Sequence, residues 1–203
     1  PIISECVRLY THPEEAEVVG GKPTGFVSVG SEIWLNEIKA LLEALLAVLG
    51  TSHPDRVLGY VIHAQEGGAW NRSPGYDASP AANAAFGRWL KTVYETPEAL
   101  QQAWNDPDVG FEHVAAPEKP GGNGPEQVFF AEADLTRNRD YLRFVSESTA
   151  AAIAAIADQV KRVAGDGAQV LVAYGASFEA LANDSGQFAL GRLLASNVDG
   201  VVT

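Results

Sequence analysis

A glutamate follows closely on an apolar run in the stretch VLGYVIHAQEGGAW, which covers residues 57–70. The run from Val57 to His63 has the composition of a buried strand, and Glu66 comes soon after its end. An acid in that position is expected to be partly desolvated, which raises its pKa and suits a general acid near neutral pH. The adjacent glycines allow a sharp turn, and Trp70 offers a flat face to a ring-shaped ligand. The alternative for Glu66 is an exposed loop acid, the usual state of charged loop residues.

Other candidate ligand-binding residues lie beside this acid and near the ends of other predicted elements. Gln65 precedes the acid, and the alternative for its amide is a structural hydrogen bond to a neighbouring loop. Arg8 suits a hydroxyl or a carboxylate, but a salt bridge within the chain explains it equally well. Trp34 and Trp70 are candidate platforms for a ring, although tryptophans more often fill cores. Tyr174 ends an apolar run, and the alternative for its hydroxyl is a hydrogen bond to the backbone.

These residues must be positioned by the elements that the apolar pattern predicts. Four apolar runs are continuous along their length, which is typical of parallel strands covered by helices. The segment from 11 to 30 reads as turn-rich and acidic. Predicted strands span 1–10, 57–63, 169–176 and 198–202, and predicted helices span 31–50, 80–94, 96–104, 134–164 and 185–195.

The alternation of strands and helices predicts an α/β fold, with a doubly wound open sheet and a (β/α)8 TIM barrel as the two candidates. No glycine-rich phosphate loop follows a predicted strand, so the barrel is favoured. A complete barrel has eight strands in roughly 250 residues. We therefore expect residues 1–203 to be part of a single barrel domain, covering about half of it, with 106–128 as a loop insertion.

Composition excludes several other classes of function. The net charge of −12 argues against nucleic acid or an anionic membrane as a partner, because both favour basic surfaces. The chain has one cysteine and four scattered histidines, so no zinc-type spacing is present. No apolar run approaches the roughly 20 residues that a membrane-spanning helix needs.

The stretch VLGYVIHAQEGGAW and the predicted elements around it resemble the clan A glycoside hydrolases, in particular the β-galactosidase family numbered 42. The resemblance covers residues 26–203. The run VLGYVIHAQEGGAW is similar to the fourth barrel strand of that family, which ends in an Asn-Glu or similar pair whose glutamate is the acid/base. Further similar stretches follow the family order: GSEIW, DASPAANAAFGRWLKTVYETPEALQQAWND, DYLRFVSESTAAAIAAIADQVK, QVLVAYGASFEAL and GQFALGRLLASNVDGVV.

The resemblance implies that the four predicted strands are the third to sixth of the barrel. It implies that Glu66 is the general acid/base, and that Gln65 stands where the family usually has an asparagine that contacts the sugar 2-hydroxyl. The nucleophile, a second glutamate, follows the seventh strand in the family, so it is expected beyond Thr203. A retaining glycosidase uses two carboxyl groups and needs no metal or organic cofactor.

Two functions from different classes remain open. The first is a retaining, β-galactosidase-like glycoside hydrolase acting on a carbohydrate. The second is a non-catalytic carbohydrate-binding or scaffold protein on a degenerate or partial barrel, which the departure at Gln65 favours. In either case we expect the open sheet edges to be covered by the remainder of the barrel or by a second copy, because unpaired edges promote aggregation.

Overall fold

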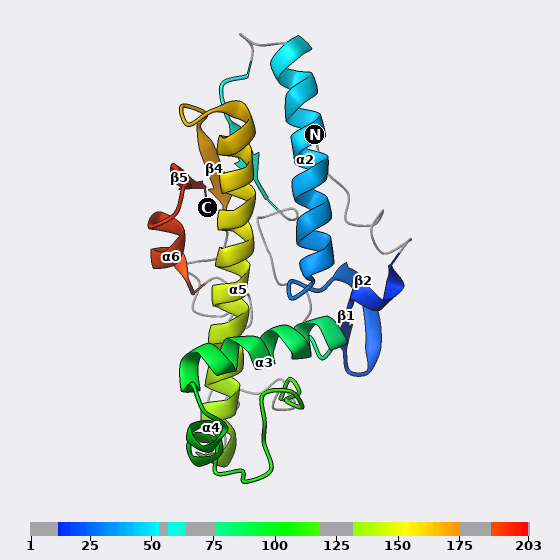
Figure 1. Cartoon of the computed structure of the whole chain (residues 1–203), viewed down its shortest axis with the longest axis vertical. Helices are drawn as coiled ribbons and strands as arrows, with labels where there is room; N and C mark the ends of the chain where they lie inside the picture. Colours follow the sequence, from blue (N-terminus) through cyan, green and yellow to red (C-terminus); the bar gives the residue numbers. More distant parts are fainter. Residues whose placement is uncertain (1–11, 53–56, 64–75, 118–131, 175–187, 203) are drawn as a thin grey trace. The chain divides into compact units, whose positions relative to one another are not determined.

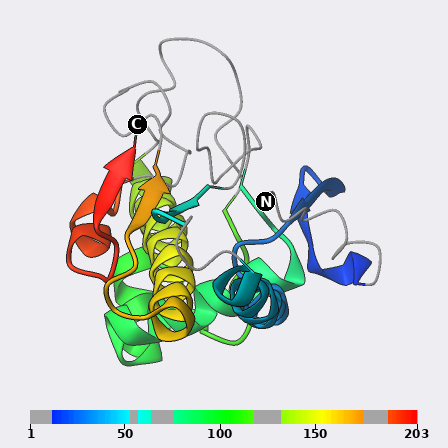
Figure 2. The same cartoon turned by 90° about the horizontal axis from the view of Figure 1, so that it is seen from above.

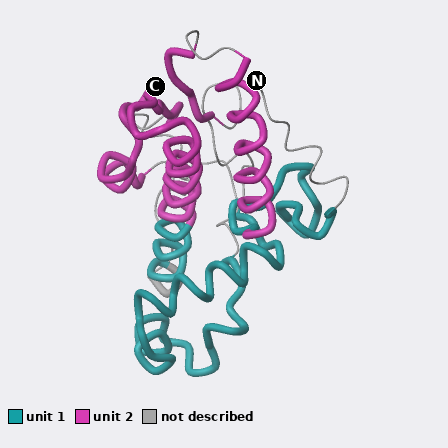
Figure 3. The backbone as a smooth tube through the Cα atoms, turned by 45° about the horizontal axis from the view of Figure 1, so that its top comes forward, with its two compact units in different colours: residues 1–31, 73–144 teal, residues 32–72, 145–203 magenta. Residues whose placement is uncertain are grey.

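The structure is a computed structural model that describes residues 12–52, 57–63, 76–117, 132–174 and 188–202 (Figure 1). The chain divides into two compact units, shown in teal and magenta in Figure 3. Unit 1 comprises residues 1–31 and 73–144, and unit 2 comprises residues 32–72 and 145–203. The first predicted strand, at residues 1–10, lies outside the described residues.

Unit 1 begins with a β-hairpin that the sequence reading did not anticipate. Strands β1 (Ala16–Val19) and β2 (Lys22–Val27) pair antiparallel, after a 3-10 helix over Pro13–Glu15. The turn residues Gly20 and Gly21 both have positive φ, at 58° and 74°. A two-residue turn with that geometry is the one that antiparallel hairpins prefer, and Gly-Gly between two extended runs is its sequence signal. The expectation that 11–30 is only turn-rich was therefore wrong.

Unit 1 also contains two capped helices. Helix α3 spans Pro80–Tyr94, as predicted, and Ser79 caps it by accepting a hydrogen bond from the Ala82 amide at 3.1 Å. Helix α4 spans Pro97–Trp104, and the Thr96 hydroxyl accepts from the Ala99 amide at 3.3 Å. Each helix has proline in its first turn, where the missing amide costs nothing.

The core of unit 1 is a cluster of aromatic rings. The Phe86 ring centroid lies 5.1 Å from those of both Tyr141 and Phe144 and 6.0 Å from that of Trp104. Offset and edge-to-face rings at such distances add to the free energy gained by burial. Trp104 is buried, and the rings of Trp89 and Trp104 both contact Phe86, so both tryptophans pack against this cluster.

Unit 2 is built on a three-stranded parallel sheet in the order β3-β4-β5. Strands β3 (Tyr60–Ile62), β4 (Val170–Ala173) and β5 (Gly200–Val202) are the described parts of three predicted strands. In Figure 2, β4 and β5 run side by side in the same direction, with α5 along one side of them. The α/β class with a parallel sheet is therefore confirmed, and the described residues contain no closed barrel.

Helices cover one face of this sheet. Helix α2 spans Glu32–Ser52, α5 spans Glu132–Ala164 and α6 spans Leu190–Leu194. Residues 145–164 of α5 belong to unit 2. The apolar cluster between helices and sheet is mainly aliphatic, and its fully buried members include Ile153, Val160, Val170, Val172, Tyr174 and Leu193.

Helix α6 is shorter than predicted. The expected helix over 185–195 includes residues 188 and 189, which are not helical in the structure; residues 185–187 lie outside the described part of the chain. Ala189 adopts φ −101° and ψ 33°, and its amide binds the Tyr174 hydroxyl instead of a helical carbonyl. A tertiary hydrogen bond therefore sets the start of this helix.

Candidate functional site

The carboxyl ends of the three parallel strands lie at one edge of the sheet in unit 2. Ile62 pairs with Val172, and Ala173 pairs with Val202, so the strands end in register. In barrels built from such strands, the residues that follow this edge form the ligand site. The segment containing Glu66 follows β3 and the segment containing Tyr174 follows β4.

The two faces of the sheet differ in how much they are covered. Ile62 and Val172 point into the helix-covered core, and Val172 is fully buried. The alternate residues face the other side, where 56% of Val61 and 47% of Val202 are exposed. Parallel sheets are normally covered on both faces. Among the described strands, this second face is therefore less covered than a face of a parallel sheet normally is.

Tyr174 is held from two directions immediately after β4. Its amide donates to the Val202 carbonyl at 3.1 Å, which extends the ladder between β4 and β5 by one residue. Its hydroxyl accepts a hydrogen bond from the Ala189 amide at 3.2 Å. The whole side chain is buried, with 0% exposed. Burial raises the pKa of this hydroxyl, and the hydrogen bond from Ala189 partly opposes that rise.

This geometry matches the alternative given above for Tyr174, a strand-end tyrosine that binds the backbone. A side chain with no exposed surface presents no atom to a ligand, so any role at the site is indirect. The hydroxyl is neutral at ordinary pH, as any tyrosine is, and the raised pKa extends that neutral range upwards. Tyr174 as a sugar-binding residue stays a prediction that its burial does not favour.

Trp34 lies in the first turn of α2 and is 7% exposed. An indole buried to this extent is typical of packing, and its role as a sugar platform stays a prediction. Tyr76 is also buried, and its ring packs against that of Tyr141 in a tilted arrangement, with 4.7 Å between the centroids.

The remaining candidates lie outside the described residues. They are Arg8, Gln65, Glu66 and Trp70. Their assigned roles rest on the sequence and the resemblance, and stay predictions.

Asp77 serves a structural purpose, as its turn chemistry indicated. Its Oδ1 accepts from the Ser79 amide at 2.9 Å, which forms an Asx-turn, and from the Val18 amide at 3.0 Å. The Tyr141 hydroxyl donates to the Asp77 carbonyl at 2.7 Å. Within unit 1, these bonds tie the Asp77 turn to the hairpin, to the start of α3 and to Tyr141 of α5.

One buried polar centre was not predicted from the sequence. Asp140 Oδ2 accepts from the Tyr94 hydroxyl at 2.5 Å and from Trp104 Nε1 at 2.9 Å. Burial and the neighbouring Asp140 carboxylate raise the pKa of Tyr94 to about 12. Asp140 opens the stretch DYLRF, but no local pattern reveals its partners, which lie 36 and 46 residues away.

The described side chains do not suggest a metal centre. Among them, no group of three or more His, Cys, Asp or Glu residues is arranged to hold a metal ion. Likewise, none of the helices in the described part of the chain combines the length and hydropathy needed to cross a membrane.

Comparison with known proteins defines the class. The profile of glycoside hydrolase family 42, described as beta-galactosidase, matches residues 26–178. The chain therefore belongs to the family 42 β-galactosidases. A search of curated proteins finds no match.

Solved structures of TIM-barrel glycoside hydrolases share the fold. The β-galactosidase of the psychrophilic Marinomonas ef1 is 18% identical with a TM-score of 0.61, over 81% of this chain and 24% of that protein. The β-galactosidase of Bacillus circulans sp. alkalophilus is 21% identical with a TM-score of 0.58, over 82% and 24%. The catalytic domain of the Paenibacillus polymyxa β-amylase is 11% identical with a TM-score of 0.61, over 95% and 54%.

The chain thus spans about a quarter of the length of these β-galactosidases. The predicted family is confirmed, and the fold is similar to part of the TIM-barrel glycoside hydrolases. That the chain forms part of a barrel stays a prediction. The assignment of these strands as the third to sixth of the barrel stays a prediction.

Proposed function

We propose that this chain forms the central part of the catalytic barrel of a retaining, β-galactosidase-like glycoside hydrolase, with Glu66 as the general acid/base. The family match over residues 26–178, which includes the stretch around Glu66, carries this proposal. The parallel register of β3, β4 and β5 supports it, because Glu66 follows the carboxyl edge where barrel enzymes place their catalytic groups.

The proposed chemistry assigns two steps to the Glu66 carboxyl group. In the first step its proton passes to the glycosidic oxygen as the bond to the sugar breaks, while a nucleophilic carboxylate bonds to the sugar. In the second step the Glu66 carboxylate takes a proton from the water that releases the sugar. We place the nucleophile after the seventh barrel strand, beyond Thr203. The two carboxyl groups of a retaining enzyme lie about 5–5.5 Å apart.

The substrate in this proposal is a β-galactoside or a related β-linked sugar. Gln65 and Trp70 would contact the sugar beside the acid. The further candidates for contact with the sugar are Arg8 and Trp34, the latter in the first turn of α2. Gln65 is longer by one methylene than the asparagine usual in the family. Its contact with the sugar 2-hydroxyl is therefore the feature of the proposed site that departs from the family pattern. The same departure favours a second candidate, a non-catalytic carbohydrate-binding or scaffold barrel.

The test is hydrolysis of a panel of nitrophenyl β-glycosides by the full-length protein, comparing wild type with Glu66→Ala. Removal of a general acid/base is expected to lower turnover by about 10²–10⁴-fold. Azide is expected to restore part of the rate on a substrate with a good leaving group, because that substrate needs no protonation and azide needs no general base.

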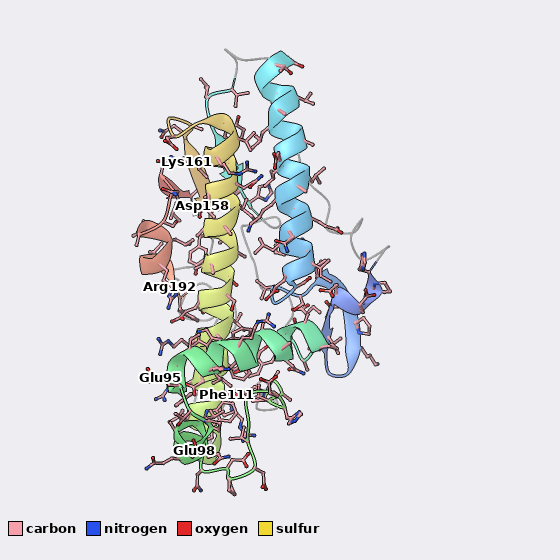
Figure 4. All side chains as sticks on the ribbon, viewed as in Figure 1. Glu95, Glu98, Phe111, Asp158, Lys161 and Arg192 are labelled. Carbon is pink, nitrogen blue, oxygen red and sulfur yellow. The ribbon has the colours of Figure 1, made fainter. Side chains whose placement is uncertain are left out.

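Glu98→Ala is the matched control, since Glu98 is an exposed acid in the first turn of α4 (Figure 4). Glu98→Ala removes the same type of side chain with little loss of stability, and it is expected to leave turnover unchanged. Turnover that survives Glu66→Ala contradicts the acid/base role. A folded, full-length wild type that binds sugars but hydrolyses none supports the second candidate instead.

A further inference from the structure

The sheet face that the helices leave open carries an imidazole at its carboxyl end. Strand β3 ends at Ile62, and His63 follows it directly. Ile62 packs in the helix-covered cluster, whereas Val61 is 56% exposed on the opposite face. Because side chains alternate along a strand, His63 lies on the same face as Val61, and it is exposed.

The neighbouring strands present small apolar side chains at the level of His63. Ile62 pairs with Val172. Continuing this register by one residue places His63 beside Ala173, which in turn pairs with Val202. The Ala173 side chain is a single methyl group, and 47% of Val202 is exposed. Among the described strand residues, this level of the open face therefore combines apolar surface with one polar side chain.

The open face is filled further from the carboxyl edge. Leu171 pairs with Gly200, and a Cβ on Gly200 would lie 3.0 Å from Leu171 Cδ2. The Leu171 side chain therefore lies over Gly200 on this face. A ligand on the described strands is thereby kept to the carboxyl side of Leu171, at the level of His63.

We propose that His63 is a sugar-binding residue, whose imidazole hydrogen-bonds a hydroxyl group of a galactose-type sugar at the carboxyl edge of the sheet. This proposal rests on the proposed function, which places the sugar at that edge. Ligand sites combine apolar surface with a few placed polar groups, and a sugar has both C–H faces and hydroxyl groups to match them. A neutral imidazole has one donor and one acceptor nitrogen, so it binds a hydroxyl in either sense.

A packing role does not fit His63. The apolar cluster of unit 2 takes Ile62 from this end of β3, and His63 is exposed on the opposite face. Because most substitutions of exposed side chains change stability little, replacing His63 should leave the free energy of unfolding nearly unchanged. A change in sugar binding then reports a lost contact with the sugar.

The test compares wild type with His63→Ala, His63→Gln and His113→Ala in the full-length protein. His63→Ala removes the imidazole, and His63→Gln keeps one donor and one acceptor group on a side chain of similar length. His113→Ala is the matched control, because His113 is an exposed histidine of unit 1.

Two readouts are measured on each protein. Calorimetric titration with galactose is expected to show Kd raised by about three- to tenfold in His63→Ala, partly restored in His63→Gln and unchanged in His113→Ala. Kinetics on a nitrophenyl β-galactoside are expected to show KM raised by a similar factor in His63→Ala, with kcat within about twofold, as for a contact made equally in ground state and transition state.

Wild-type Kd and KM in His63→Ala overturn the proposal, and so does an equal rise in His113→Ala. A kcat that falls 100-fold or more in His63→Ala at unchanged Kd overturns the binding role in favour of proton transfer. A wild type without turnover contradicts the proposed function, whereas the galactose titration still decides whether His63 contacts the sugar. A wild type that binds no galactose overturns the proposal.

Discussion

The core of unit 1 consists of aromatic rings joined by buried hydrogen bonds, whereas the core of unit 2 consists of aliphatic side chains packed on a parallel sheet. In unit 1, Phe86 packs against Phe144 and Trp104, and the Trp104 indole also donates to the Asp140 carboxylate. In unit 2, Ile153, Val172 and similar side chains make the contacts. The ionised groups of unit 2 lie at its surface.

Three ion pairs illustrate the surface charges of unit 2. They join Lys161 to Asp199 at 2.7 Å, Arg162 to Glu43 at 2.8 Å and Arg192 to Glu147 at 2.7 Å. Figure 4 labels Lys161 and Arg192. The exposed pair of Arg162 and Glu43 is expected to contribute roughly 0–1 kcal/mol. In the other two pairs, Lys161 and Glu147 are partly buried. A buried carboxylate such as Asp140 has no water to replace a lost partner, so the same chemical deletion costs more in unit 1.

The two units are therefore expected to differ in how much stability they lose when a side chain is replaced or displaced. Hydrogen bonds and ring contacts depend on direction, so unit 1 tolerates little displacement. Aliphatic packing depends mainly on volume, so unit 2 accepts conservative substitutions at lower cost. The following substitutions test this difference from the largest expected effect to the smallest.

The largest difference is expected between two helical glycines changed to alanine. In α3, a Cβ on Gly87 would overlap the carbonyl oxygen of Phe111, which is labelled in Figure 4. Gly87→Ala must therefore displace backbone, and we expect it to destabilise the protein by about 3 kcal/mol or more. In α2, a Cβ on Gly50 meets nothing within 4 Å, and Gly50→Ala should stabilise by up to about 1 kcal/mol.

Urea unfolding of both variants measures these free energies. Equal effects of the two substitutions would show that the close approach of α3 to the loop at Phe111 is not a constraint, and the contrast between the units would lose its strongest support.

The next effect concerns the buried carboxylate of unit 1. Asp140→Ala leaves the Tyr94 hydroxyl and Trp104 Nε1 without their acceptor, and we expect a loss of about 2–4 kcal/mol. Asp140→Asn keeps one acceptor oxygen and should lose less than half as much. Thermal unfolding, with Trp104 fluorescence as a local probe, distinguishes them. If both variants match wild type, the hydrogen bonds of this centre contribute nothing to stability.

The smallest effect is a dependence on alkaline pH. Because the pKa of Tyr94 is raised to about 12 in the folded protein, its neutral form contributes stability in full below the unfolded pKa near 10. That contribution is lost as pH rises from about 10 through 12. Tyr94→Phe removes one hydrogen bond, and we expect it to cost about 1 kcal/mol at pH 8.

Unfolding of wild type and Tyr94→Phe at pH 8 and pH 11 checks the sign. The difference between the two proteins should be smaller at pH 11, because wild type loses there what the variant never had. A difference that grows with pH would contradict the raised pKa of Tyr94.

Helix bounds could be predicted to within a residue or two where the residues that set them are neighbours in the sequence. The bounds of α3 and the caps at Ser79 and Thr96 follow from residues adjacent in sequence, and the structure has them as expected. The hairpin at Gly20 and Gly21 also carried a local signal, in the form of a Gly-Gly turn between extended runs, that the reading missed. The strands predicted at 57–63 and 198–202 are longer than β3 and β5, which begin only at Tyr60 and Gly200.

The candidate site was predicted only in its outline. The family match bears out the likeness around Glu66, but the role of each side chain there depends on partners that the sequence alone does not identify. Tyr174 illustrates the limit. Its position at a strand end suggested a ligand, and its hydroxyl instead binds Ala189, 15 residues further along the chain.

By itself, the sequence determined the α/β class, the capped helices and the family, because capping, apolar periodicity and family motifs are properties of neighbouring residues in the chain. Only the tertiary structure decided which buried polar groups pair, as Asp140 does with Tyr94 and Trp104. The physical reason is that a buried hydrogen bond needs two groups brought to about 3 Å. Folding sets that distance between residues that are remote in sequence.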